Sequence, residues 1–355
     1  MAAAEAILLE DGCRLRRGAL DHGYVRLLLI AVLSGLVCQF SASFPLADRR
    51  FGGPSPYHFL FKQVEYALIG LAIMALVCRL SPERVLKSRA LSWMFVIGLG
   101  TLVLCRWGPW AHPAGGSYCW LGLSRNLSLQ PSEFVKVVYL LLLARVLARG
   151  AQSAAARRAV LPTSLALMGL MCVGLAIQED LGMAFLVVGM TLGMLFLGGV
   201  NVFLLLLLAV VLGLGGLGAA SLSPERWERL TGFWQPWRDP MGSGYHPCLM
   251  LAALARGGLG GVTLGMSPDK WGALPTPHTD SIFCVIGGEL GFIGAALVLL
   301  LFYLLTARAF LVAERAGTPS AWYIGGGLGM MLGLQALVNI AVATVCIPCT
   351  GLTLP

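Results

Sequence analysis

A long stretch without a charged residue, from Leu181 to Pro224, limits what this chain can fold into. A helix that crosses a bilayer needs about 20 apolar residues, each adding about 1.5 Å, so this stretch suffices for two crossings joined by a turn at 198–201. The whole chain is 57% hydrophobic and 12% charged, whereas about a quarter of the residues in a soluble domain are charged. The sequence therefore excludes a water-soluble fold and predicts membrane helices.

Seven further apolar runs also read as spans, so we predict an all-α, polytopic membrane helix bundle of about nine transmembrane helices. The run at 133–149 departs most from this pattern, because Glu133, Lys136 and Arg145 interrupt it. The seven runs cover residues 27–47, 58–78, 90–106, 133–149, 159–178, 282–306 and 322–346.

The basic residues of this chain indicate its orientation. The formal net charge is +8, and Lys and Arg gather in short loops that alternate onto one side of the predicted bundle. Cationic loops stay cytoplasmic, so we predict a cytoplasmic N-terminal segment at 1–26 and one membrane domain at 27–355. No predicted soluble domain carries a basic face, so no nucleic-acid partner is expected.

The loop between spans seven and eight, at about 223–281, is the longest and falls on the outer side. Long loops outside compact elements are usually functional. Arg226 and Arg229 lie near its start and Lys270 later in it, and guanidinium groups suit phosphate oxygens. The alternative is a solvated charged turn, since Glu225 and Glu228 flank the same arginines.

The segment from Leu274 to Phe292 carries the most informative acid. His278, Thr279 and Asp280 stand where the outer loop turns into span eight. A carboxylate at the edge of an apolar cavity can act as a general base towards a hydroxyl. Two plainer alternatives stay open: Thr279 or Asp280 is a helix N-cap, and His278 is structural rather than a metal ligand or the base.

Ionisable side chains within the spans form a second group of candidates, because charge at membrane depth costs a few kcal/mol. Glu133 and Lys136 are three residues apart at the outer start of span four, and Glu289 lies one or two turns into span eight. The first two are candidates for a self-neutralising helix pair or for an outward-facing site.

Several motifs occur in an order that resembles one family, the SEDS proteins (FtsW/RodA/SpoVE) of bacterial cell-wall synthesis. The motifs extend through most of the chain, and several in register are more specific than any one of them. They are QFSAS at 39–43, LQPSEFVKV at 129–137, QEDLGMAFLVVGMTLGMLFLGG at 178–199, DPMGSGY at 239–245, GGLGGVTLG at 257–265, DKWGALPTPHTDSIFCVIGGELGFIGA at 269–295 and LVNIAVATVCIPCTGLTLP at 337–355.

The resemblance implies a peptidoglycan glycosyltransferase that polymerises lipid II into β-1,4-linked glycan in the bacterial cytoplasmic (inner) membrane, for division, elongation or sporulation. A class B penicillin-binding transpeptidase and other division or elongation machinery are the implied partners. The family's key acid matches Asp280, which would take the proton of an acceptor hydroxyl in a single inverting displacement. Further matches, read as lining the outward cavity, are Trp120, Gln130, Ser132, Glu133 and Lys136.

The leaving group implied by the resemblance is an undecaprenyl pyrophosphate, so cations must meet it. Arg226, Arg229 and Lys270 are the candidates on the outer side, with a divalent cation such as Mg²⁺ or Mn²⁺ as a candidate aid.

This chain also differs from the family pattern. Cys119 stands where the family has Arg, Ser281 follows the acid in place of Phe, and the sequence stops where the family continues into a tenth span. A protein shortened at its C-terminus is therefore expected. Two alternatives to the polymerase follow: a lipid II flippase or transporter, and a catalytically weak scaffold that recruits the transpeptidase.

Overall fold

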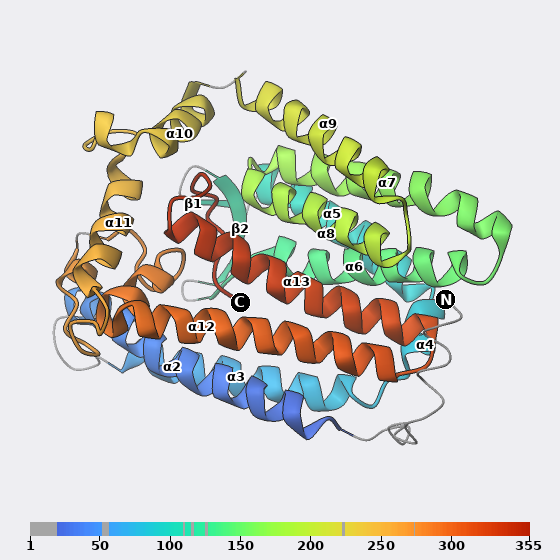
Figure 1. Ribbon diagram of the computed structural model, residues 1–355, viewed down its shortest axis with the longest axis horizontal. Helices are drawn as coiled ribbons and strands as arrows, with labels where there is room; N and C mark the ends of the chain where they lie inside the picture. The colour runs from blue at the N-terminus through green and yellow to red at the C-terminus, as the bar shows by residue number, and fades with distance from the viewer. Residues whose placement is uncertain are drawn as a thin grey trace.

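The computed structural model describes residues 20–51, 57–108, 111–114, 117–124, 127–221, 224–272 and 274–355. Long helices lie side by side in these residues, most of them with roughly parallel axes (Figure 1). In chain order they are α2 His22–Phe51, α3 His58–Val77, α4 Pro82–Lys87, α5 Ala90–Trp107, α6 Pro131–Gly150, α7 Ala154–Ile177, α8 Leu181–Leu197, α9 Val202–Ser221, α10 Pro224–Trp234, α11 Tyr245–Gly257, α12 Ile282–Arg315 and α13 Pro319–Ala343, with 3-10 turns η1 Pro236–Arg238 and η2 Pro268–Trp271.

The helical bundle confirms the predicted fold class. Seven of the described helices are long and apolar enough to cross a membrane, and α8 is a shorter apolar helix of 17 residues. The predicted run at 133–149 is helix α6, which carries charged residues at both ends. Each predicted apolar run therefore coincides with a helix in the described part of the chain.

A small antiparallel sheet between α5 and α6 was not predicted. Its strands are β1 Ala111–Ala114, β2 Ser117–Ser124 and β3 Leu127–Leu129, in the order β1-β2-β3. The backbone N–H of Tyr118 donates to the carbonyl of Gln178 at 3.0 Å, which ties β2 to the end of α7. The sheet gives the loop after α5 its own backbone hydrogen bonds, which would otherwise lack partners.

The largest core lies between α5, α6, α7, α8 and α13. Tyr139, Leu186 and Met190 are fully buried there. The Tyr139 hydroxyl contacts the Thr191 hydroxyl at 2.5 Å, and Thr191 donates onward to the Val187 carbonyl at 2.7 Å. Inside a bilayer close packing and interhelical hydrogen bonds drive helix association more than the hydrophobic effect does, so contacts of this kind hold the bundle together.

The predicted outer loop is largely structured. It contains α10, η1, α11 and η2, and α11 packs against the start of α12. Figure 1 places α10 and α11 at one end of the bundle and α4 at the opposite end. The loop and the start of α12 therefore meet at the same end of the molecule.

Helix α12 is broken at Gly291, whose φ of 66° and ψ of −165° are not helical. The loop after α11 fills the break: the Phe292 N–H donates to the Gly258 carbonyl at 2.9 Å, and the Thr263 N–H donates to the Glu289 carbonyl at 3.0 Å. A Cβ at Gly291 would collide with the backbone of Leu259 and would strain this left-handed conformation. The break thus joins the first part of α12 to the loop that precedes it in the chain.

Candidate functional site

Asp280 lies in the last turn before α12, as predicted, but it is not the helix cap. Helix α12 begins at Ile282, its N-cap is Ser281, and no side chain makes a capping hydrogen bond there. The N-cap interpretation of Thr279 and Asp280 is therefore wrong. The Thr279 hydroxyl instead donates back to the Thr276 carbonyl at 3.4 Å, within the turn.

The turn that carries Asp280 is tight. Thr276 has a φ of 43°, in the left-handed region that residues other than glycine rarely adopt. Its carbonyl accepts from the N–H groups of Thr279 at 3.1 Å and Ser281 at 3.4 Å. Such a backbone costs about 1–3 kcal/mol and persists only where the surrounding structure holds it.

His246 of α11 supports the same turn. The Ser281 hydroxyl donates to the Pro275 carbonyl at 3.0 Å and lies 3.2 Å from Nε2 of His246. Since the hydroxyl proton is used, Nε2 is the donor in this contact, which assigns the tautomer. Burial lowers the pKa of His246, so the ring is neutral at pH 7.

The Asp280 carboxylate is half-buried, and no residue in the described ranges donates a hydrogen bond to it. Burial raises the pKa of Asp280, and no charged side chain contributes to this shift. A Cβ placed on Gly351, near the end of the chain, would lie 4.0 Å from its Oδ2. A carboxylate short of donors and desolvated is more basic than one in water, which suits proton abstraction.

Helix α13 connects Asp280 to the predicted pair on α6. Nδ2 of Asn339 donates to the Asp280 carbonyl at 3.2 Å. One turn earlier, Oε1 of Gln335 accepts from Nζ of Lys136 at 2.7 Å. Lys136 also pairs with Glu133 at 2.6 Å, and the Lys136 side chain is 4% exposed whereas Glu133 is 37% exposed. The structure thus brings Asp280, Lys136 and Glu133 to one face of α13. Within the α6 pair, Lys136 is buried and Glu133 is open to a ligand.

The segment after α13 folds back across this face. The Leu352 carbonyl accepts from Nδ2 of Asn339 at 2.7 Å, and the Thr353 carbonyl accepts from Nε2 of Gln335 at 3.1 Å. Thr350 lies against Gly182 at the start of α8, where even a Cβ would collide with the Thr350 backbone. This segment is a wall of the region around Asp280.

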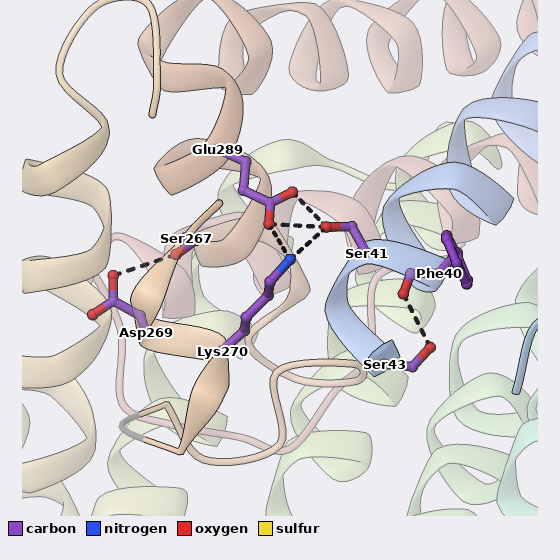
Figure 2. A network of polar contacts seen from close by, with 7 residues as sticks. All are labelled: Phe40, Ser41, Ser43, Ser267, Asp269, Lys270 and Glu289. Atoms are coloured by element: carbon purple, nitrogen blue, oxygen red, sulfur yellow. Dashed lines mark hydrogen bonds and ion pairs between the residues drawn. The ribbon is translucent and has the colours of Figure 1, made fainter. Parts of the chain in front are cut away.

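Ser41, Lys270 and Glu289 form a second polar cluster, whose side chains are buried. Lys270 and Glu289 lie within about ten residues of Asp280 in the chain, whereas Ser41 comes from α2. Nζ of Lys270 is 2.7 Å from Oε1 of Glu289 and 2.9 Å from the Ser41 hydroxyl, and both charged side chains are 2% exposed. Figure 2 shows the two charged side chains pointing toward each other and toward Ser41 on α2. The sequence predicts Lys270 and Glu289 as substrate-binding residues. In the structure both side chains are buried and paired with each other, so neither presents a charge to a ligand.

Asp269, the neighbour of Lys270 in η2, contacts α11, whereas Lys270 contacts α12. It pairs with Arg256 of α11, and the Ser267 hydroxyl donates to its Oδ2 at 3.4 Å. Asp269 is buried and Arg256 is not. Two adjacent residues of η2 therefore hold α11 on one side and α12 on the other.

The other predicted residues are more dispersed. Trp120 lies half-buried on β2 opposite His112, and no hydrogen bond or ring contact among the described residues joins it to the Asp280 turn. Gln130 is the N-cap of α6, and Ser132 is fully buried in the first turn of that helix. The His278 ring lies 6.3 Å from the Phe59 ring of α3.

Arg226 and Arg229 belong to helix α10, and their side chains lie outside the described residues. Their predicted role towards phosphate therefore stays a prediction.

Four side chains of the site were not predicted: Ser41, His246, Gln335 and Asn339. A signal existed for two of them, since Gln335 and Asn339 are polar, four residues apart and inside an apolar run, which places them on one helix face. Ser41 and His246 gave no such signal, because their partners lie 229 to 248 and 35 residues away in the chain.

Comparison with known proteins agrees with this arrangement. Residues 21–355 match the sequence model of the FtsW/RodA/SpoVE family, described as cell cycle protein. The chain is 35% identical to the probable peptidoglycan glycosyltransferase FtsW of Coxiella burnetii, over 96% of this chain and 92% of that protein. It is 32% identical to the stage V sporulation protein E of Bacillus subtilis, over 93% of this chain and 88% of that protein.

One solved structure is similar throughout. It is a chain from work on "Structural coordination of polymerization and crosslinking by a peptidoglycan synthase complex", with a TM-score of 0.74 and 28% identity, covering 95% of this chain and 91% of that one. The arrangement of helices described above is therefore shared with a chain from that work on a peptidoglycan synthase complex.

Proposed function

This chain belongs to the FtsW/RodA/SpoVE family, and from that premise we propose that Asp280 is the general base of an inverting glycosyl transfer. The protein is a multi-pass membrane protein and a peptidoglycan glycosyltransferase that polymerises lipid II in bacterial cell-wall synthesis. The proposal concerns how this chain's residues perform that reaction.

One observation carries the proposal: the Asp280 carboxylate is half-buried, accepts no hydrogen bond from the described residues, and has a pKa raised by burial. A general base must have free lone pairs and a pKa closer to the working pH than that of an aspartate in water. Glu289, the other acid of the same segment, is saturated by Lys270 and Ser41 and does not meet this condition.

The reaction balances with one base. Asp280 takes the proton of the 4-hydroxyl of the acceptor GlcNAc while that oxygen forms a bond to the anomeric carbon of the donor MurNAc. The bond from that carbon to the pyrophosphate oxygen breaks, and undecaprenyl pyrophosphate leaves with the electron pair. A single displacement converts the α-linked donor into a β-1,4 linkage, and the proton on Asp280 is then lost to solvent.

The negative charge on the leaving pyrophosphate needs cations near it. Arg226 and Arg229 of α10 remain our candidates, since Lys270 is already paired with Glu289. No three His, Cys, Asp or Glu side chains converge within the described ranges. A divalent cation such as Mg²⁺ would be held mainly by the pyrophosphate oxygens and water, and it would help to neutralise the charge of the leaving group.

The proposed orientation places the N-terminus in the cytoplasm and the 223–281 segment outside the bacterial inner membrane. Arg79, Arg84 and Arg89 lie in or beside α4, at the end of the bundle opposite α11. Cationic loops stay cytoplasmic, so the Asp280 end faces outward. Lipid II would then reach Asp280 from the outer leaflet.

We further propose that this chain works with a transpeptidase of the class B penicillin-binding type. The support is the similarity to a chain of a synthase complex that coordinates polymerisation with crosslinking. The two activities use the same glycan, so a complex would deliver the new strand directly to the crosslinking enzyme.

The test uses the purified full chain with its partner transpeptidase and labelled lipid II. We expect glycan polymer from the unaltered chain and none from Asp280→Asn. Polymer from Asp280→Asn at the unaltered rate would refute the assignment of the base. Movement of lipid II between leaflets without polymer would favour the flippase, and neither activity would favour the scaffold.

A further inference from the structure

Two residues of the Ser41–Lys270–Glu289 cluster flank the Asp280 turn in the sequence. Lys270 lies in η2 before Asp280, and Glu289 lies in α12 after it. The direct Lys270–Glu289 ion pair of 2.7 Å therefore closes a chain segment that has Asp280 near its middle. Because the two ends of that segment are held together, the turn between them has less freedom to move.

The polar atoms of Ser41, Lys270 and Glu289 are hydrogen-bonded to one another. Oε2 of Glu289 accepts from the Ser41 hydroxyl at 2.7 Å, its Oε1 accepts from Nζ of Lys270 at 2.7 Å, and the Ser41 oxygen accepts from the same Nζ at 2.9 Å. Separating Lys270 from Glu289 would leave two buried charges without their partners, which is strongly unfavourable. The buried ion pair therefore favours the arrangement observed.

Ser41 brings a third element into the cluster, since it lies on α2. Just beyond Glu289, the Gly291 break binds the loop after α11, and Asp269 next to Lys270 binds Arg256 of α11. The start of α12 is thus fixed against both α2 and α11. All these contacts lie outside the Asp280 turn itself.

We propose that Lys270, Glu289 and Ser41 are positioning residues for the reaction: their buried cluster fixes the Asp280 turn so that its carboxylate meets the acceptor hydroxyl. This inference rests on the proposed function of Asp280. It replaces the predicted contact of Lys270 and Glu289 with substrate, because both side chains are 2% exposed. A displacement of about 1 Å at a catalytic group costs on the order of 100-fold in rate.

The first experiment compares Lys270→Met with Lys270→Met/Glu289→Leu in the polymerisation assay with the partner present. The single variant leaves the buried Glu289 without its cationic partner, so the turn shifts. We expect kcat to fall about 10- to 100-fold, with KM for lipid II changed less than about threefold. The double variant removes both charges, and we expect it to recover at least about tenfold of the loss.

Recovery in the double variant separates positioning from substrate contact. If Lys270 met the pyrophosphate, removing Glu289 as well would restore nothing, and equal losses in both variants would overturn the inference. Activity of Lys270→Met at the unaltered rate would overturn it too. In both cases loss of activity in Asp280→Asn would still stand, so the proposed function and this inference fail by different results.

A matched control exists at the other end of the same helices. Arg308 of α12 donates to Asp21, beside the start of α2, at 2.9 and 3.0 Å. Arg308→Met removes another ion pair of α12, with Asp21 just before α2, far from Asp280 in the chain. We therefore expect lower stability with kcat within about twofold of the unaltered chain. A loss of kcat equal to that of Lys270→Met would show a general effect of stability and overturn the inference.

Ser41→Ala is a milder variant that tests the same inference if Lys270→Met does not fold. It removes one hydroxyl and keeps the ion pair, so the bundle should form. The missing donor and acceptor loosen the cluster, and we expect kcat to fall about three- to tenfold. The pH profile adds a second readout: a loosened turn admits water to Asp280, so the acid limb of kcat/KM moves to lower pH.

Burial alone raises the pKa of Asp280, with no contribution from His246 of α11 or from the Lys136–Glu133 pair of α6, so the limb reports how well the turn excludes water. Unchanged kcat and an unchanged limb in Ser41→Ala would overturn the inference.

Discussion

Asp280 and Glu289 are acids of one short segment with opposite surroundings. Glu289 is 2% exposed and accepts hydrogen bonds from Ser41 and Lys270, whereas Asp280 is half-buried with no donor among the described residues. A saturated carboxylate is stabilised as an anion and holds structure in place. An acid left short of partners keeps lone pairs for a substrate proton, which is the property catalysis needs.

The largest expected effect comes from removing the unsaturated acid. Asp280→Asn keeps the size of the side chain and removes its basicity, so we expect polymerisation to fall by about 10²- to 10⁴-fold. The measurement is glycan product from labelled lipid II, resolved on a gel. Glu314→Gln, an exposed acid at the far end of α12, is the control and should polymerise normally.

The saturated acid should matter for stability. Glu289→Ala leaves Lys270 buried without its partner, which should lower the free energy of unfolding by about 3–5 kcal/mol. A denaturant titration in detergent measures this. The double variant Lys270→Met/Glu289→Leu should regain most of the loss, and a double variant as unstable as the single one would contradict the view that the pair acts as a unit.

The wall beside Asp280 can be displaced without touching either acid. Gly182→Ala places a methyl group against the Thr350 backbone, and the overpacking should cost about 1–3 kcal/mol. Gly169→Ala on α7 is the matched control, since nothing lies within 4 Å of a Cβ there. Equal stability of the two variants, measured by the same titration, would show that the segment after α13 does not rest on α8 as described.

A smaller effect is expected from the support of the turn. His246→Leu removes the donor to Ser281 and should cost about 0.5–1.5 kcal/mol. His246→Gln can place an N–H donor near the position of Nε2 and should retain more of this stability. If the two variants unfold together in the titration, the hydrogen bond at 3.2 Å contributes nothing measurable.

The smallest expected effect is on the pH dependence of kcat/KM, which also distinguishes Asp280 from Glu289. Burial raises the pKa of Asp280 above its ordinary 3.8, so kcat/KM should fall as the pH drops through this raised value, because the protonated acid cannot accept a proton. The His246→Gln variant should show the same limb, which assigns it to Asp280. A limb that disappears in His246→Gln would assign the titration to the histidine instead.

Much of this protein could be predicted from its sequence. Long apolar runs require helices in a bilayer, so they predict the nine apolar helices in the described part of the bundle but not α4, α10 or α11. The motif around Asp280 marks the acid at the start of α12. The sequence does not predict the sheet, because β1 and β3 are short and its strands have no strong alternation of apolar and polar residues.

The sequence alone determines where the helices lie and which acid is the candidate base. Both follow from the length of an apolar run and from the residues within a few helical turns. Only the tertiary structure decided which charges stay available. Lys270 resembles a free cation for phosphate in the sequence, yet in the structure it pairs with Glu289 at the start of α12. The packing of α2 against α12 also brings Ser41 to it from 229 residues away in the chain. Burial and partners are properties of that packing, so they determine which of two similar carboxylates can take a proton.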